Sequence, residues 1–478
     1  WGSSYKALAN CTPTPPSFTN KYSLALDGID DYLNCGDVTT LSNASTFTYS
    51  GWYNQTTLDQ EAFMFGSQVD ANNFIGFYTW SNGNLYIDMK QGSIRYGYFD
   101  YSLYVTAGQW FHFAVVFNGS GATTSDKIKC YINGALITLT LPYSFPTSTP
   151  TGTNITGIGK MDTFSQTWNG SADECSLFST AKTGLEITDI YNLGTPTDLS
   201  ALAGLTNWYR NGDNGTWQSP QWLIPNNENK TKFSNYSFSY DGIDDYVDFG
   251  NPTELQITTD LSVSFWFKGS STADQAIVAK DNLGLRCWAI WNNVYGAGNN
   301  LQFYISNSNS LTEVQTSANY NDGNWHNVVC IFKPSTYLRI YVDGVLDGEN
   351  TTSIPATIDN DAVNLTVGAI FSSSSPIFEF EGSVDEVAIW NSDQSSNIGY
   401  IYSSGTPADL SSLSPVGYWR SENSTFSTNW TVTDNGSGSS DGTSANMTIE
   451  DRTGDAPNST NNALSLNMDE VDRETDTP

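Results

Sequence analysis

The chain has few basic residues: 19 Lys and Arg stand against 50 Asp and Glu in 478 residues, a formal net charge of −31. A surface of that sign repels nucleic-acid phosphates and anionic lipids, so both are poor candidate partners. No apolar run approaches the roughly 20 residues that a membrane-spanning helix needs. The excess of acidic residues would favour binding of divalent cations, or it serves only to keep the protein soluble.

Signatures of catalysis are also missing. The sequence has two histidines, His112 and His326, and contains no Glu-x-Asp-x-x-Glu arrangement of the kind that supplies acid and nucleophile to a glycosidase. It has no G-x-S-x-G elbow, phosphate-binding loop or zinc-ligand spacing. We therefore expect a protein without enzymatic activity.

A long internal repeat is the main positive feature. YSLALDGIDDYLNCG from Tyr22 returns as YSFSYDGIDDYVDFG from Tyr236, and GQWFHFAVVF from Gly108 as GNWHNVVCIF from Gly323. YINGAL returns as YVDGVL, GSADECSLF as GSVDEVAIW, and IYNLGTPTDLSAL as IYSSGTPADLSSL. Repeats of this length each carry their own core. The expected organisation is an arm (1–19), a first domain (20–210), a connector (211–234), a second domain (235–420) and a tail (421–478).

Each repeat is predicted to be all-β. Abundant Gly, Asn, Ser and Thr, with 14% aromatic residues, are typical of short strands joined by turns. Tyr22, Leu24 and Leu26 alternate with Ser23 and Ala25, the period of a half-buried strand. Short helices are expected only near 184–192 and 395–403. The pattern favours two tandem antiparallel sandwiches of two sheets each.

These blocks resemble the laminin-G-like, concanavalin A-like jelly-roll family, in its pentraxin-related branch. The resemblance covers both repeats and implies curved antiparallel sheets with adjacent first and last strands. It also implies binding of glycans or proteins, often with calcium and usually without catalysis. The tail from Thr443 resembles the ends of similar proteins encoded by marine tailed phages.

Two acidic turns are candidate calcium sites. Each DGIDDY crowds three carboxylates into five residues, and Ca²⁺ prefers such oxygen ligands. The pairing of first and last strands implied by the family would bring a fourth carboxylate, from each DE pair, to each turn. Alternatively, Asp-Gly only makes a tight turn and the other carboxylates bind loop amides. The candidate ligands are Asp27, Asp30, Asp31 and Asp173 in the first repeat, and Asp241, Asp244, Asp245 and Asp385 in the second.

Tryptophans near loop ends are candidate sugar platforms. Trp80, Trp288 and Trp291 could expose an indole ring for stacking, although core packing is the alternative for each. The cysteines do not share positions between the repeats, which argues against a common disulfide framework. Cys35 and Cys175 could touch if first and last strands pair, as a disulfide or as buried free thiols.

The tail is expected to be ordered by contact. It is poor in apolar residues, yet Leu464, Leu466 and Met468 alternate with polar residues, as in a strand that begins a third repeat. Such a strand gains order by joining the edge of an existing sheet. The expected partner is a neighbouring subunit or another virion protein, with the second repeat as the alternative. Deletion of 421–478 is then expected to leave both sandwiches folded.

The function predicted from the sequence is that of a virion surface protein of a tailed phage. It would be a capsid decoration or fibre component that possibly binds host glycans and forms part of a larger assembly. The alternatives are a secreted or cell-surface bacterial lectin and, in another class, an unrecognised glycosidase.

Overall fold

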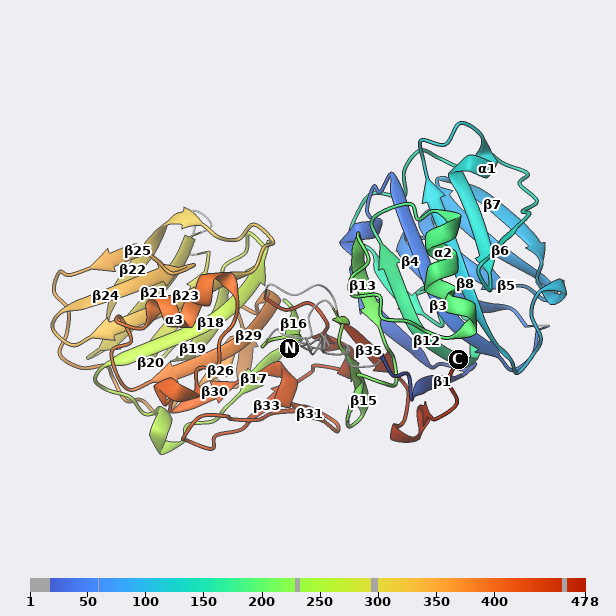
Figure 1. Ribbon diagram of the computed structural model, residues 1–478. Coiled ribbons are helices and arrows are strands. Elements are labelled where there is room, and N and C mark those ends of the chain that lie inside the picture. The colour runs from blue at the N-terminus through green and yellow to red at the C-terminus, as the bar shows by residue number, and fades with distance from the viewer. Residues whose placement is uncertain (1–17, 59, 228–232, 294–299, 458–461) are drawn as a thin grey trace, which may run out of the picture.

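The computed structural model of the protein describes residues 18–58, 60–227, 233–293, 300–457 and 462–478. The chain forms two lobes, here domain 1 and domain 2, and each contains two antiparallel sheets (Figure 1). The two predicted tandem sandwiches are thereby confirmed. The predicted N-terminal arm lies almost wholly outside the described residues, as does Cys11. Within them, no helix has the length and apolar character needed to cross a bilayer.

Domain 1 has an eight-stranded sheet and a nine-stranded sheet. The first contains, in spatial order, β10 (Ala135–Ile137), β9 (Ile128–Ile132), β8 (Trp110–Asn118), β3 (Thr46–Gln55), β12 (Asn169–Phe178), β1 (Ser23–Asp27) and β36 (Arg473–Glu474), with β13 (Leu205–Tyr209) also paired to β12. The second contains β14 (Thr216–Gln218), β15 (Gln221–Ile224), β35 (Ala463–Leu466), β2 (Tyr32–Gly36), β11 (Ile155–Ile158), β4 (Ala62–Asp70), β5 (Asn73–Thr79), β6 (Asn84–Gln91) and β7 (Ser93–Asp100).

Domain 2 repeats this strand order. Its first sheet contains β25 (Val345–Asn350), β24 (Tyr337–Val342), β23 (His326–Lys333), β18 (Leu261–Gly269), β29 (Glu381–Trp390), β16 (Ser237–Asp241) and β34 (Arg452–Thr453), with β30 (Gly417–Trp419) on β29. Its second contains β22 (Ser310–Asn319), β21 (Asn300–Asn307), β20 (Leu285–Asn292), β19 (Gln275–Asn282), β26 (Thr366–Val367), β17 (Tyr246–Asp248), β33 (Gly442–Ala445), β32 (Trp430–Val432) and β31 (Thr425–Phe426). A separate hairpin pairs β27 (Ile370–Ser372) with β28 (Ser375–Ile377).

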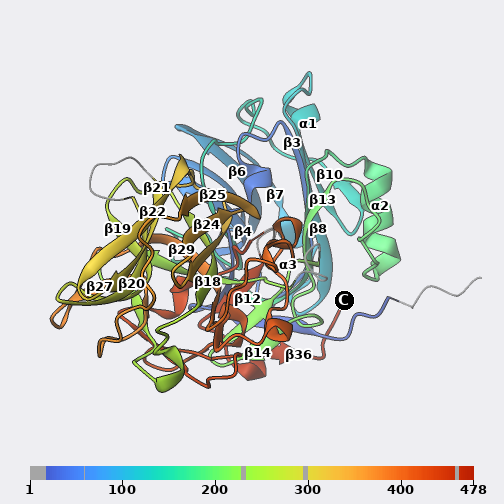
Figure 2. The same ribbon diagram turned by 90° about the vertical axis from the view of Figure 1, so that its left-hand side faces the viewer.

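Helices are short and lie where the sequence predicts them, as α2 (Gly184–Tyr191) and α3 (Ile398–Tyr402), with α1 (Thr124–Lys127) as an additional turn. Thr183 and Glu186 form a capping box that satisfies free amides at the start of α2. Ile187 and Ile190 of α2 pack with Ala114 of β8, so this helix covers the outer face of the eight-stranded sheet (Figure 2).

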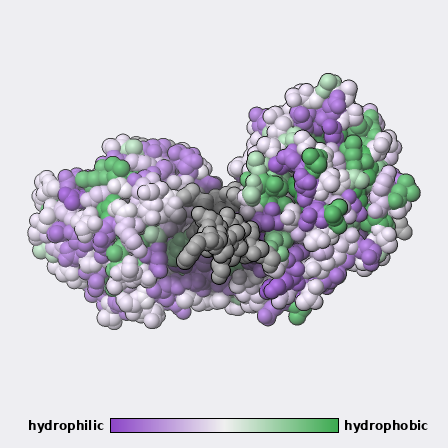
Figure 3. Space-filling view, in the orientation of Figure 1, coloured by the Kyte–Doolittle hydropathy of each residue, from purple (hydrophilic) through white to green (hydrophobic). Residues whose placement is uncertain are grey.

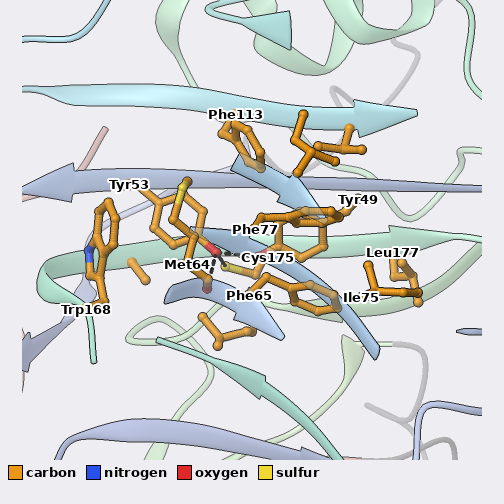
Figure 4. Packing of buried hydrophobic residues seen from close by; sticks show 14 of the residues in the cluster. Tyr49, Tyr53, Met64, Phe65, Ile75, Phe77, Phe113, Trp168, Cys175 and Leu177 are labelled. Atoms are coloured by element: carbon orange, nitrogen blue, oxygen red, sulfur yellow. Dashed lines mark hydrogen bonds between the residues drawn. The ribbon is translucent and has the colours of Figure 1, made fainter. Parts of the chain in front are cut away.

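Aromatic side chains fill the space between the sheets of domain 1 (Figure 4). Tyr49 packs against Phe65 with ring centroids 4.3 Å apart, and the Tyr53 hydroxyl donates to the Met64 carbonyl at 3.0 Å. Cys35 and Cys175 lie close together in this core as free thiols, so they do not form a disulfide. Burial first, and then the proximity of Cys175, raise the pKa of the Cys35 thiol.

The segment predicted as a connector belongs largely to domain 1. Its hairpin of β14 and β15 pairs Trp217 with Trp222 and extends the nine-stranded sheet. The neighbouring strand is not local: Leu223 pairs with Leu464 near the end of the chain. The predicted connector boundary is therefore wrong, because part of it is a structural element of the first sandwich.

The tail holds two copies of one short motif instead of a third repeat. SANMTIEDRTGD from Ser444 matches SLNMDEVDRETD from Ser465, 21 residues later. We name residues 442–455 closing segment 2 and residues 463–476 closing segment 1, after the domains that they complete. The strands of closing segment 2 are β33 and β34, and those of closing segment 1 are β35 and β36.

The two segments make the same contacts in their two domains. Ser465 Oγ accepts a hydrogen bond from Trp222 N at 2.6 Å, and Ser444 Oγ accepts one from Trp430 N at 2.8 Å. The carbonyl four residues after each serine accepts from the indole of the same tryptophan, at 2.9 and 2.7 Å. Met468 and Met447 are both buried. The segments are thus equivalent structural elements.

The chain is consequently nested. Domain 2 and its closing segment lie between domain 1 and the segment that closes domain 1. Because β35 lies between β15 and β2, it is an internal strand of its sheet and not an edge strand. In the structure the tail is ordered on its own chain, with Ala463 and Met468 in the core of domain 1 and Leu464 and Leu466 on the other face. The expected alternation of three apolar residues therefore ends at Leu466.

Candidate functional site

The two acidic turns have the same internal hydrogen bonds. Asp27 Oδ1 accepts from the amides of Ile29 and Asp30, at 2.7 and 3.3 Å. Asp31 Oδ2 accepts from Asp27 N at 2.9 Å, and Gly28 supplies the positive φ of 76°. The second turn repeats this network at 2.8, 3.3 and 3.1 Å. Part of the carboxylate crowding therefore serves to build the turn that leads from β1 to β2.

Each turn also has the geometry of a small cation site. In each, one oxygen from each of the three aspartates lies within 4.8 Å of the others. In the described residues, the Asp30 and Asp244 carboxylates accept no hydrogen bond, so they have free oxygens. Burial and nearby carboxylates, opposed by a backbone hydrogen bond, raise the pKa of Asp31 to about 7 and that of Asp245 to about 6. A proton therefore competes with any cation at the most buried ligand.

Asp173 and Asp385 do not join these clusters, contrary to the prediction. In β12 the residue opposite Asp27 is Asn169, and Asp173 lies four positions further along the strand. Asp173 accepts a hydrogen bond from Asn20 Nδ2 at 2.7 Å, and Asp385 accepts one from Ser234 Oγ at 2.5 Å. Both carboxylates instead fix the chain that enters the first strand of each domain.

The neighbouring glutamates form buried ion pairs. Glu174 Oε1 accepts from Arg210 Nε at 2.9 Å, and Glu386 Oε1 accepts from Arg420 Nε at the same distance. Both glutamates have positive φ, 48° and 54°, in the bulge that redirects β12 and β29. Burial raises the pKa of both carboxyls and the arginines oppose it. The DE pairs are thus structural, which accounts for their appearance in both repeats.

The three candidate tryptophans divide into one exposed and two buried residues. Trp80 is 39% exposed and packs edge-to-face on Tyr78. Trp288 lies in the core of domain 2, and Trp291 packs against Phe378 with centroids 5.0 Å apart. The prediction of exposed rings is wrong for these two. Trp288 shares the inward face of β20 with Ile290, whereas Trp291 faces outward and is covered by the β27–β28 hairpin.

Trp80 is one member of an aromatic surface that the sequence interpretation did not find. Tyr78, Tyr86 and Tyr98 are cross-strand neighbours on β5, β6 and β7, with successive ring centroids 5.4 Å apart. Tyr96 packs against Tyr86 and against Tyr143, which is 43% exposed. We name this surface the tyrosine face; it comprises Tyr78, Trp80, Tyr86, Tyr96, Tyr98 and Tyr143. It lies on the outer side of the nine-stranded sheet, on and beside strands β5, β6 and β7, which are labelled in Figure 1.

Polar groups accompany these rings. Asp88 Oδ2 accepts from the Tyr78 hydroxyl at 2.8 Å, whereas Asp88 Oδ1 is buried and has no partner within the described part of the chain. Burial, opposed by the Tyr78 hydrogen bond, raises the pKa of Asp88 to about 7. The Arg95 guanidinium lies 5.7 Å from the centre of the Tyr143 ring. The surface therefore combines stacking rings with the Arg95 donor, while Asp88 lies buried beneath the rings and orients the Tyr78 hydroxyl.

The same face of domain 2 is covered. Ile370, Ile377 and Phe378 of the β27–β28 hairpin pack over the sheet. Beside the hairpin lies a pocket of about 290 Å³, lined by Asp248, Asp281, Asn282, Ala362, Val363, Asn364, Phe371, Ser373 and Ser374. One Asp281 oxygen pairs with Tyr304, and the other has no partner among the described residues. Domain 2 thus offers a polar pocket where domain 1 offers an aromatic surface.

Neither histidine has the surroundings of an exposed catalytic base. His112 is fully buried, its Nε2 lies 2.7 Å from Ser50 Oγ, and burial lowers its pKa to about 3. His326 bridges Asp343 and Asp322 at 2.7 and 3.2 Å beside the turn between β24 and β25. Both positions fit structural histidines on strands.

These observations define a protein built from two laminin-G-like sandwiches. Residues 27–188 and 241–397, more than half of the chain, match the concanavalin A-like lectin/glucanases superfamily in its laminin-G group. The chain therefore belongs to that superfamily.

Several solved structures are similar to the chain. Mouse laminin alpha1 chain domains LG4-5 share 11% identity over 81% of this chain and 93% of that one, with a TM-score of 0.27. A putative carbohydrate-binding protein from Bacteroides ovatus shares 11% identity over 88% and 91%, with a TM-score of 0.37. A heptameric pentraxin from Limulus polyphemus shares 15% identity over 36% and 82%, with a TM-score of 0.29. No curated protein matches the chain.

Proposed function

We propose that the protein is a non-enzymatic glycan-binding protein that uses the tyrosine face of domain 1. The observation that carries this proposal is the run of stacked rings across β5, β6 and β7, which ends in the exposed Trp80. Aromatic faces pack against the C–H surfaces of sugars, while a few polar groups fix the orientation of the ligand. Arg95 supplies such a group at this surface, and the buried Asp88 fixes the orientation of the Tyr78 hydroxyl.

The charge of the protein narrows the ligand class. A net charge of −31 disfavours sulfated and uronic acid polymers, because the approach of a polyanion is repelled. Figure 3 shows a surface on which polar residues predominate and hydrophobic residues are scattered in small groups. Neutral oligosaccharides are therefore the proposed ligands.

A binding assay tests this function. A panel of neutral and acidic oligosaccharides would be titrated into the full chain, followed by the variants Tyr86→Ala and Trp80→Ala. Each variant should weaken binding of neutral ligands by about tenfold or more, which corresponds to about 1.4 kcal/mol. Tyr400→Ala is the matched control, since Tyr400 is an exposed tyrosine on α3 of domain 2. Equal affinities for all variants, or preferential binding of acidic ligands, would refute the proposal.

The proposed setting is the surface of a tailed-phage virion, as a capsid decoration or fibre component. The resemblance of the tail to such phage proteins supports this setting. Mass spectrometry of purified particles and antibody labelling of intact particles test it. Detection of the chain only in culture fluid or on bacterial cells would instead favour the alternative, a secreted or surface lectin.

Calcium is the proposed ion for the DGIDDY turns. Three carboxylates in each turn lie close enough to share one ion, and Asp30 and Asp244 have free oxygens. A cation there would neutralise the repulsion among these groups and so stabilise the turn between β1 and β2, or between β16 and β17. Its role would be structural.

A further inference from the structure

The contact between the two domains is made by a hairpin and an arginine. The β14–β15 hairpin of domain 1 lies against closing segment 2 of domain 2. Gln221 Oε1 accepts from Arg452 Nε at 3.2 Å and from Nη2 at 2.7 Å, and Gln218 Oε1 accepts from Nη1 at 2.7 Å. The same glutamine side chains donate to the carbonyls of Glu422 and Ile449 at 2.5 and 3.1 Å. A short polar hairpin thus satisfies a buried guanidinium.

Burial makes this arrangement specific. Arg452 is fully buried and lies 4.5 Å from the Trp430 ring centre, so its donors need protein acceptors. Leu223 on the hairpin packs with Tyr236 of domain 2, which adds an apolar contact beside the polar one. The interface therefore combines a buried charged donor with acceptors of matching geometry.

Domain 1 carries the equivalent of this arginine without the equivalent hairpin. Arg473 occupies the same place in closing segment 1 as Arg452 in closing segment 2: it pairs with Leu24 as Arg452 pairs with Phe238. Its guanidinium lies 3.7 Å from the Tyr22 ring centre. Arg473 Nε is buried and has no hydrogen-bond partner in the part of the chain that the structure describes, whereas Arg452 Nε has Gln221.

Domain 2 has a hairpin equivalent to β14–β15. Among the described residues, that hairpin does not contact an arginine of the other domain as β14–β15 does. The β31–β32 hairpin pairs Phe426 with Trp430 as the β14–β15 hairpin pairs Trp217 with Trp222. By this alignment Asn429 takes the place of Gln221. The outward residues Ser427, Asn429 and Thr431 are exposed, and residues 425–432 contain no charged side chain.

We propose that the face of domain 1 around Tyr22 and Arg473, the Arg473 face, binds the β31–β32 hairpin of a second copy of this chain. The contact would repeat, between molecules, the one that joins the two domains within a molecule. Asn429 Oδ1 would accept from Arg473 as Gln221 Oε1 accepts from Arg452. Because the two surfaces are different and lie on different domains, the association is head-to-tail and builds a filament or a closed ring.

The second copy is favoured over an unrelated partner because each copy carries both halves of the contact. The hairpin is neutral, so it places no like charge against Arg473, while the net charge of −31 on each copy opposes association and keeps the contact weak at low salt. A contact centred on one hydrogen-bonded arginine is expected to be weak and to become populated at high local concentration.

Sedimentation of the full chain over a range of concentrations tests the proposal. The donor variant is Arg473→Gln and the acceptor variant is Asn429→Lys, which places a cation opposite the guanidinium. Ser310→Lys, an equal charge change at an exposed strand end far from both surfaces, is the control. Each of the first two variants should weaken self-association at least tenfold, and the control should leave it unchanged.

Mixing the two variants gives the sharper result. Each retains one intact surface, so an equimolar mixture should form dimers that do not grow further. The proposal is overturned if the chain stays monomeric up to about 1 mM, the range of the weakest specific contacts. It is also overturned if neither variant alters association, or if the mixture associates no better than each variant alone. Should Arg473→Gln prove unfolded by circular dichroism, Asn429→Lys decides by itself, because its side chain is exposed.

Discussion

Domains 1 and 2 share a strand order but differ in what lies over one sheet. The loop that follows β11 spans ten residues from Gly159 to Trp168, and its counterpart after β26 spans thirteen from Gly368 to Phe380. Both glycines have positive φ, and both loops end with a hydrogen bond from the last residue to the glycine carbonyl. The longer loop contains the β27–β28 hairpin. The shorter loop of domain 1 places Phe164 over Phe63 and Phe74, whereas the longer loop of domain 2 covers Trp291, the counterpart of Tyr78.

The comparison shows where divergence is tolerated. The DE ion pairs, acidic turns and closing segments are repeated almost atom for atom, because each fixes the path of the chain at an edge of the sandwich. The outer face of the larger sheet carries no such constraint. This face carries stacked tyrosines in domain 1 and is partly covered by the β27–β28 hairpin in domain 2. Function is expected to differ between the domains at this face.

The largest expected effect comes from removing closing segment 1. Deletion of residues 457–478 takes an internal strand and the core residues Ala463 and Met468 from domain 1, and leaves closing segment 2 in place. We expect domain 1 to lose its cooperative transition, a destabilisation on the order of 5 kcal/mol or more, since a single buried Met→Ala change costs about 2–5. Scanning calorimetry should show the domain 2 transition alone.

Survival of both transitions in this deletion would contradict the nested arrangement. Deletion of residues 421–478 should remove both transitions, because Trp430 and Met447 are core residues of domain 2. The sequence led us to expect that both sandwiches fold without the tail. The structure instead predicts that neither does.

The second effect tests the symmetry of the DE ion pairs. Glu174→Gln and Glu386→Gln each remove the nearer of two carboxylates from a largely buried arginine; Asp213 and Glu422 remain 3.5 Å from Arg210 and Arg420. Breaking one side of a buried pair costs about 3–5 kcal/mol, which is the upper bound here because a second carboxylate remains, and each variant should lower the stability of its own domain only. Urea unfolding followed by fluorescence measures this. Glu349→Gln, in a more exposed pair with Arg339, should cost less than about 1 kcal/mol.

How much of this follows from the sequence differs from feature to feature. The repeat predicts two sandwiches because five matched blocks in one order leave little freedom in topology. Closing segment 1 escapes prediction since Trp222 and Ser465, which share a hydrogen bond, are 243 residues apart. The repeated motif in the tail is a usable signal, but only the partner strands reveal its meaning.

The tyrosine face illustrates a second limit. The alternation in β5, β6 and β7 places Tyr78, Tyr86 and Tyr98 each on one side of its own strand. Their stacking depends on which strands are neighbours and in what register, and these are properties of the folded sheet. Burial of Trp291 depends on a hairpin from a distant part of the sequence. A local sequence pattern predicts which side of a strand a residue faces. It does not predict which other segment of the chain covers that side.

A smaller effect concerns Asp88, a carboxylate that domain 2 replaces with Tyr304. Because the folded pKa of about 7 lies above the usual value, the folded state binds the proton more tightly. This contribution to stability is present below about pH 4 and is lost as the pH rises to about 7. Asp88→Asn should therefore stabilise the chain by roughly 3 kcal/mol at pH 8, relative to its effect at pH 4.

Urea unfolding at both pH values measures this difference. Asp70→Asn is the control, because hydrogen bonds from Asn73 and Asn72 lower the pKa of Asp70 and its effect should have the opposite sign. A difference between the Asp88 variant and the parent chain that does not change with pH would contradict the burial of an ionised carboxyl at this site.

The smallest expected effect is that of calcium, and it should be shared by both domains because their acidic turns are the same. An ion that binds only the folded state at 100 times its dissociation constant adds about 2.7 kcal/mol. Since the pKa of Asp31 is about 7 and that of Asp245 about 6, deprotonation favours binding as the pH rises. Excess calcium should raise both calorimetric midpoints more at pH 7.5 than at pH 5.5, and a chelator should reverse the change.

Asp30→Asn should abolish the calcium-induced shift in domain 1 only, and Asp244→Asn should do the same in domain 2. Midpoints that are equal with calcium and with chelator would leave the turns as hydrogen-bonded corners of the fold, without an ion.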